Sequence, residues 1–180
     1  MQSIRVFRYY QKLLHDRPYV VQSVQTVTLM SIGDIISQSC VEKKGFSQIN
    51  YYRVAKFGSV GLVLGPALTS WYRFLDKLQF KSLKFVLVRK IAMDQMIFAP
   101  FAVGSITSLV SFFDGQTTQE VKQRLQADFF TILLNNYKLW PFVQYVNFSL
   151  VPLDYRVLVT QCVGVAWNTY LAWKLNAEKT

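Results

Sequence analysis

The stretch QMIFAPFAVGSITSLVSFF, residues 95–113, contains no charged side chain. A helix needs about 20 mainly apolar residues to cross a bilayer, with a range of roughly 17–25. Similar stretches occur at 18–41 with the single charge Asp34, at 57–72 with none, at 129–151 with only Lys138, and at 157–173 with none. The sequence therefore predicts an all-α integral membrane bundle in a single domain, 1–180. Four spans are expected near 18–41, 52–72, 90–113 and 129–151, and residues 157–173 form a candidate fifth span at the short limit of length.

The composition supports a membrane protein. Of 180 residues, 52% are hydrophobic and 17% are charged, against about 25% charged in an average soluble domain. This apolar content excludes a disordered chain. A soluble helical protein with a large core is the alternative, but five apolar stretches leave too little polar surface to cover them. The mean hydropathy of +0.20 is modest for an integral protein, so the spans must carry polar residues.

Several chemical classes find no support in the residue types. One His and two Cys are too few for a clustered metal site. The chain has no Gly-rich phosphate loop, no G-x-S-x-G sequence and no His-Glu metal motif. We therefore expect no enzyme activity, no metal and no cofactor.

The charges collect between the apolar stretches, and the net charge is +10. Residues 1–17 carry +3, residues 73–90 carry +5, and residues 114–130 carry −1. Basic residues that flank spans favour contact with anionic lipid rather than direct nucleic-acid binding. Alternating spans and the positive-inside rule place 1–17 and 73–90 on one face, the matrix in a mitochondrion, and 114–130 on the other.

The amino end, residues 1–17, has the pattern of an amphipathic basic helix. Apolar Val6 and Tyr10 lie on one side of a helical projection, and Arg8 and Lys12 lie on the other. Such a helix lies on an anionic membrane. It also resembles a mitochondrial targeting sequence, and the sequence favours neither interpretation.

The first span has one polar face that contains Gly33, Asp34 and Ser37. A carboxylate inside a membrane costs about 2.5–3.5 kcal/mol on insertion scales. Asp34 should therefore face water or a partner and is a candidate pore-lining residue. Gly33, spaced small-xxx-small with Ser37, is a candidate for helix packing.

The third span carries a second group of candidate pore-lining or gating residues. Lys90 and Asp94 are four residues apart and are spaced to pair, Gln95 follows, and Ser105 lies on the same face. Pro100 bends the helix between Asp94 and Ser105. This pattern suits a pore wall or gate, and equally a static salt bridge that holds the bundle together.

Three local patterns predict how helices pack and end. Gly61 and Gly65 form a GxxxG pair that permits close approach of another helix. Residues 117–120 predict a capping box that opens a short interfacial helix. Trp140-Pro141 predicts either a break or a kink in the fourth stretch. A fourth pattern concerns the membrane surface: Trp71-Tyr72 is typical of a membrane-interface belt.

The ordered set of these motifs resembles the Mpv-seventeen family, which includes the peroxisomal membrane protein of twenty-two kilodaltons. The residues that carry the resemblance are Gly33, Asp34, Trp71, Asp94, Gln95, Pro100, Trp140, Pro141, Gln144, Asn147, Pro152, Arg156, Trp167 and Asn168. The composition is most similar to that of the family's mitochondrial inner-membrane founder. The resemblance implies a helical protein usually drawn with four spans. It also implies a non-selective channel that modulates membrane potential and supports mitochondrial DNA maintenance and metabolite homeostasis.

Two functions therefore compete. The first is a mitochondrial inner-membrane channel for ions and small metabolites, with Asp34 and Asp94 inside and the basic 73–90 segment at a mouth. The second is a non-conducting organising protein whose GxxxG pair binds partner helices or a second copy of the chain. A peroxisomal membrane pore of the same family is a further alternative.

Overall fold

The computed structural model describes residues 2–78 and 83–176, which form helices and short connections without any strand. The all-α prediction is confirmed. The elements are α1 (Gln2–Asp16), α2 (Pro18–Ile36), η1 (Ser37–Val41), η2 (Phe46–Gln48), α3 (Tyr51–Asp76), α4 (Leu83–Met93), η3 (Asp94–Phe98), α5 (Ala99–Phe113), α6 (Thr118–Leu150) and α7 (Leu153–Asn176). The segments η1 and η3 are π-helical, and η3 joins α4 and α5.

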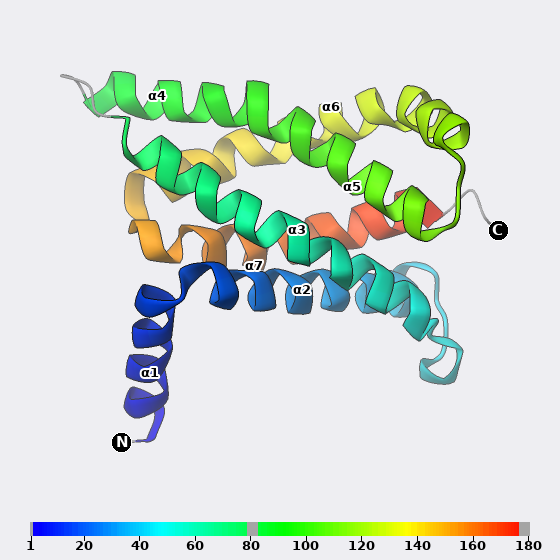
Figure 1. Cartoon of the computed structure of the whole chain (residues 1–180), viewed down its shortest axis with the longest axis horizontal. Helices are drawn as coiled ribbons and strands as arrows, with labels where there is room; N and C mark the ends of the chain where they lie inside the picture. Colours follow the sequence, from blue (N-terminus) through cyan, green and yellow to red (C-terminus); the bar gives the residue numbers. More distant parts are fainter. Residues whose placement is uncertain (1, 79–82, 177–180) are drawn as a thin grey trace.

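The long helices lie side by side and alternate in direction (Figure 1). At one end, here called the α1 end, α3 finishes, α4 begins, and α6 turns into α7. At the far end lie the α2–α3 connection, the α5–α6 turn and the carboxyl end of α7. α1 turns away from α2 and projects from the bundle (Figure 1), and its position on the membrane surface stays a prediction. Hydrogen bonds hold it to the bundle, from Gln11 to Tyr155 at 2.6 Å and from Gln25 to Tyr10 at 2.7 Å.

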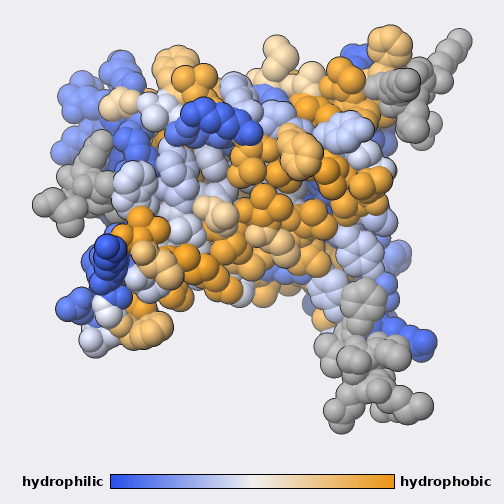
Figure 2. Space-filling view, turned by 180° about the vertical axis from the view of Figure 1, so that it is seen from behind, coloured by the Kyte–Doolittle hydropathy of each residue, from blue (hydrophilic) through white to orange (hydrophobic). Residues whose placement is uncertain are grey.

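The exterior of the bundle is largely apolar along its middle (Figure 2). Exposed side chains there include Val24, Leu62, Met96, Phe130 and Phe142. Within the described residues, one helix, Phe85–Phe113, is long and apolar enough to cross a membrane by length and composition. α2, α3, α6 and α7 contain 19, 26, 33 and 24 residues, or about 29–50 Å at 1.5 Å per residue. These lengths are compatible with a core about 30 Å thick, and crossing by these four helices stays a prediction.

α6 differs from its sequence-based prediction in length. The capping box is confirmed, because the Thr117 hydroxyl accepts a hydrogen bond from the Glu120 N–H and the Glu120 carboxylate accepts one from the Thr117 N–H at 2.7 Å. The helix that it opens is not short, since it runs through Pro141 to Leu150, and the alternative of a break at Pro141 is wrong. One missing N–H is tolerated because the flanking turns pack inside the bundle, where Trp140 contacts Trp167 edge to face.

Glycines set the distance between α2 and its neighbours. A Cβ added to Gly61 would lie 2.6 Å from the backbone nitrogen of Val27, and one added to Gly65 would lie 2.6 Å from the Cα of Ser23. The GxxxG pair of α3 therefore packs against α2 of the same chain. Gly33 approaches α7 in the same way, with Asn168 Cβ at 2.7 Å from an added Cβ.

Candidate functional site

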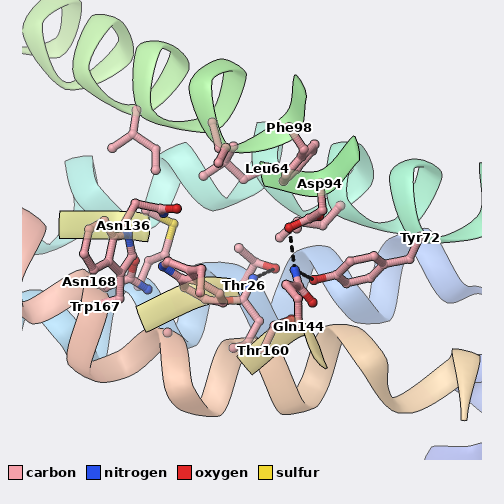
Figure 3. Close-up of a pocket in the computed structure, with 18 of the residues that line it drawn as sticks. Thr26, Leu64, Tyr72, Asp94, Phe98, Asn136, Gln144, Thr160, Trp167 and Asn168 are labelled. Atoms are coloured by element: carbon pink, nitrogen blue, oxygen red, sulfur yellow. Dashed lines mark hydrogen bonds between the residues drawn. The ribbon is translucent and has the colours of Figure 1, made fainter. Parts of the chain in front are cut away.

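A cavity of about 90 Å³ lies inside the bundle, between α2, α3, η3–α5, α6 and α7. Its wall is mixed, with apolar side chains such as Leu64 and Phe98 beside a set of polar ones (Figure 3). The polar residues of the wall are Thr26, Tyr72, Asp94, Gln95, Asn136, Gln144, Thr160, Gln161 and Asn168, together with the indoles of Trp140 and Trp167.

Asp94 is the carboxylate of this cavity and is only 3% exposed. Its Oδ1 accepts a hydrogen bond from Trp71 Nε1 at 2.9 Å, and its Oδ2 accepts from Gln95 Nε2 at 2.8 Å and from Gln144 Nε2 at 2.9 Å. Gln144 also donates to the Tyr72 hydroxyl at 3.0 Å, and both bonds are drawn in Figure 3. Three neutral donors thus hold the carboxylate.

The expected pairing of Lys90 with Asp94 is wrong. Lys90 Nζ lies 3.5 Å from the carboxylate of Asp76, which also receives Arg156 at 2.8 Å. Asp76 is 39% exposed in its side chain, so an ion pair there loses less hydration than a pair inside the bundle. Asp94 already has three donors, and Lys90 is satisfied at the end of α3.

The π-helical segment η3 explains why two consecutive polar residues, Asp94 and Gln95, are both buried. The Ala99 N–H donates to the Asp94 carbonyl, five residues back. The equivalent donor for the Gln95 carbonyl would be Pro100, which has no N–H. The Tyr137 hydroxyl supplies the missing bond to that carbonyl at 3.0 Å. Pro100 and Tyr137 together stabilise a helix irregularity of the kind often found at functional sites.

Three polar atoms on the cavity wall have no hydrogen-bond partner within the described part of the chain. They are Gln95 Oε1, Asn136 Oδ1 and Trp140 Nε1. The amide of Gln95 is oriented by its own donation to Asp94, so its free atom is the oxygen. A polar cavity of this size has room for several water molecules, and these atoms could bind them or a small polar solute.

The other predicted pore residues lie elsewhere in this conformation. Asp34 is fully buried toward the far end, where Arg53 Nε lies 2.7 Å from it and Gln38 donates to it at 2.9 Å. Arg53 also pairs with Glu42 at 2.6 Å. Lys90, Pro100 and Ser105 do not line the cavity, whereas Asp94 and Gln95 do.

Part of the family motif lines the cavity or contacts its wall, and the rest lies in the helices and turns around it. Trp140, Gln144, Trp167 and Asn168 line it, Trp71 donates to Asp94, and Asn147 donates to Gln144 at 3.2 Å. Arg156 supports the end of α3 through Asp76, Pro141 lies within α6, and Pro152 lies in the α6–α7 turn.

Sequence reasoning missed three residues of these networks. Tyr72 does not belong to an interface belt, since it is buried and its hydroxyl accepts from Gln144. Arg53 and Tyr137 were not singled out. A search for the obligatory partner of Asp34 would have pointed to Arg53, the first basic residue of the next span, because buried charges need partners. No sequence signal identifies Tyr137 as the partner of a backbone carbonyl.

Comparisons with known proteins identify the family of this chain. A profile of the Mpv17 / PMP22 family matches residues 111–172. The rat and human proteins named mitochondrial inner membrane protein Mpv17 are 42% and 41% identical to the chain over 170 residues, which is 94% of this chain and 97% of each relative. The chain belongs to the Mpv17/PMP22 family. Protein sym-1 of Neurospora crassa is 37% identical over 174 residues, covering 94% of this chain and 98% of that protein.

No solved structure matches this member of the Mpv17/PMP22 family. The family profile covers most of α6 and α7, the two helices that contribute Asn136, Trp140, Gln144 and Trp167 to the cavity. The relatives named mitochondrial inner membrane protein Mpv17 match this chain over nearly their whole length. The chain is therefore a protein of the mitochondrial inner membrane.

Proposed function

We propose that this protein is a non-selective channel for ions and small metabolites, and that its path runs through the cavity around Asp94. The main observation behind this proposal is that the buried carboxylate of Asp94 accepts hydrogen bonds from three neutral donors. It shares the cavity with polar atoms that have no hydrogen-bond partner in the described part of the chain. A charged residue at membrane depth is costly, and ionisable residues there mark ion and substrate pathways. A purely structural carboxylate would be expected to have a cationic partner, as Asp34 has in Arg53.

On this proposal, this conformation of the chain is a closed state of the channel. The cavity of about 90 Å³ has room for several water molecules or a small polar solute, but it is not an open path across the bundle. Passage of metabolites therefore requires the helices to separate. By opening, the channel would modulate the membrane potential and the exchange of small metabolites, and through them support the maintenance of mitochondrial DNA.

The charge at the α1 end suits a channel mouth. Residues 73–90 carry +5, and among them Lys77 and Arg89 are exposed. Clustered positive charge raises the local concentration of anions such as phosphorylated metabolites. Asp94, deeper in the bundle, would then favour cations at the narrow part of the path.

Asp94→Asn tests this proposal, because it removes one charge and nearly preserves shape. We expect the reversal potential in a planar bilayer under a KCl gradient to move toward reduced cation preference, with an unchanged melting curve in detergent. Asp154→Asn is the matched control, since it removes the same charge from an exposed site at the start of α7, where salt screens it. It should shift the reversal potential much less than Asp94→Asn and leave the melting curve unchanged.

Three outcomes would contradict this proposal in whole or in part. A folded wild-type protein that never conducts would favour the non-conducting organising role. A reversal potential that Asp94→Asn leaves unchanged would remove Asp94 from the path. If Asp94→Asn instead collapses the melting curve, the carboxylate serves to hold the bundle.

A further inference from the structure

The helices around the cavity carry three zones in the same order along the bundle. On α3, Leu64 lines the cavity and Val60 and Phe57 follow with no exposed surface. Lys56 and Arg53 come next and form buried ion pairs with Asp114 and Asp34, respectively. Toward the far end, α3 therefore passes from a mixed cavity wall to an apolar zone and then to buried charge.

α6 and α7 repeat this order from the same starting point. On α6, Asn136 lines the cavity, Ile132 has no exposed surface, and Asp128 follows among charged residues. On α7, Asn168 lines the cavity, Leu171 is 1% exposed, and Lys174 pairs with Asp128 at 2.7 Å.

α5 completes the apolar zone. Ala102 and Ile106 line the cavity, Val110 has no exposed surface, and Asp114 beyond it pairs with Lys56. Apart from Ala102, these apolar side chains belong to one buried cluster, and α5 also carries the buried polar side chains Thr107 and Ser111 in this zone. We call the set nearest the charges the apolar layer: Phe57, Val60, Val110, Ile132, Leu171 and Ala172.

The other side of the cavity differs. Toward the α1 end, Gln144 contacts Asn147, and Arg156 reaches Asp76, whose side chain is 39% exposed. A second buried apolar cluster, which includes Leu75, Phe148 and Val157, also lies on this side, and these polar contacts lie among its helices. At the far end, the apolar layer separates the cavity from the buried charges.

Apolar constrictions close channels because water leaves them and ions do not enter without water. Here the layer is packed, so opening must separate its side chains and hydrate them at a cost that scales with their apolar area. We propose that the apolar layer is the gate of the channel, and that its hydration limits opening. This inference rests on the proposed channel function and adds to it the place and physical nature of the barrier.

Val60→Thr and Val110→Thr test the gate from two different helices. Threonine keeps the shape of valine, and in a helix its hydroxyl bonds to the carbonyl of the preceding turn, so folding is preserved. The hydroxyl lowers the cost of hydrating the layer. We expect the resting K⁺ efflux from proteoliposomes, normalised to folded protein, to rise about tenfold for each variant.

Two controls separate polarity from other effects. Val63→Thr makes the same change on α3 at a side chain that is 49% exposed. Val157→Thr makes it at a valine of α7 that is 1% exposed but lies in the second buried cluster, outside the layer. Both should leave the efflux at the wild-type level.

The outcomes distinguish the gate from the channel itself. Suppose that the wild type conducts and that Asp94→Asn changes its reversal potential. If Val60→Thr and Val110→Thr then leak no more K⁺ than Val63→Thr, the gate is overturned and the channel stands. An equal leak from Val157→Thr would assign the effect to a general loosening of the bundle and also overturn the gate. If the wild type and both threonine variants fold and none conducts, the channel and its gate are both wrong.

Discussion

At the scale of single residues, two buried carboxylates in this protein have opposite environments. Asp34 meets the guanidinium of Arg53 at 2.7 Å, whereas Asp94 accepts hydrogen bonds from an indole and two amides. An ion pair that is buried with its hydrogen bonds satisfied stabilises a fixed arrangement. A carboxylate without a cation keeps a local negative field, and this difference is the reason for proposing a functional role for Asp94 rather than for Asp34.

The carboxylate of Glu42 makes the far-end cluster sensitive to acid. Burial acts to raise its pKa, but hydrogen bonds from Arg53 at 2.6 Å and Lys44 at 2.7 Å outweigh burial and lower the pKa from 4.5 to about 2. A pKa that is lower in the folded state means that ionised Glu42 stabilises the fold. This contribution is complete above the unfolded pKa of 4.5 and is lost as the pH falls toward 2.

Glu42→Gln should therefore make the free energy of unfolding depend less on pH in the acid range. Near neutral pH we expect it to lower the free energy of unfolding by about 1–2 kcal/mol, since the pair is partly screened by solvent. At the acid end, where wild-type Glu42 is protonated, the two proteins should melt alike. Detergent melting curves across this pH range measure the difference, and a gap between variant and wild type that does not shrink as the pH falls from 4.5 toward 2 would refute the assignment.

At the scale of elements, glycine decides how α2 and α3 pack. Gly61 and Gly65 allow backbone contact along one face of α3, so the pair that could have bound another chain is occupied by α2. This leaves the organising hypothesis without its main binding motif. The same pair explains why a helix of weak amphipathicity keeps one orientation in the bundle.

Gly61→Ala or Gly61→Leu should destabilise the bundle strongly, because even one Cβ would lie 2.6 Å from backbone. We expect a loss of about 2–4 kcal/mol and the same direction for Gly65→Leu. Gly104→Ala is the matched control, since an added Cβ there meets its nearest atom at 3.9 Å. That change should leave stability equal or raise it by about 0.5–1 kcal/mol. Equal melting of the Gly61 and Gly104 variants would show that α2 and α3 do not pack this way.

At the scale of the whole molecule, the order of helices brings like segments to the same end. α1, the end of α3 and the start of α4 lie at the α1 end, and the start of α6 lies at the far end (Figure 1). This agrees with the charge pattern of +3 for 1–17, +5 for 73–90 and −1 for 114–130. We therefore predict that these two ends face opposite sides of the inner membrane.

Single-cysteine labelling tests that topology. The background protein has Cys40 and Cys162 replaced by Ser. An impermeant thiol reagent added on one side of the membrane should label Lys12→Cys and Lys77→Cys. The same reagent added on the other side should label Lys122→Cys. All three positions carry exposed side chains on the described helices or at their ends. Equal labelling of Lys77→Cys and Lys122→Cys from one side would contradict the arrangement, and labelling after detergent addition controls for reactivity.

The sequence by itself determined the helical class, the approximate positions of the long helices other than α6, and the capping box at Thr117, because these depend on local composition and spacing. It also located Asp94, Gln144 and Asn168 as residues of interest. The sequence could not decide which partner each polar group takes, since a helical projection shows the face of a residue and not what lies opposite. Only the tertiary structure paired Lys90 with Asp76, directed Tyr137 to the Gln95 carbonyl, and set an apolar layer between the cavity and the far-end charges. Those choices depend on contacts between helices far apart in the chain, where burial makes each unpaired polar group costly and so selects the partner that packing brings within reach.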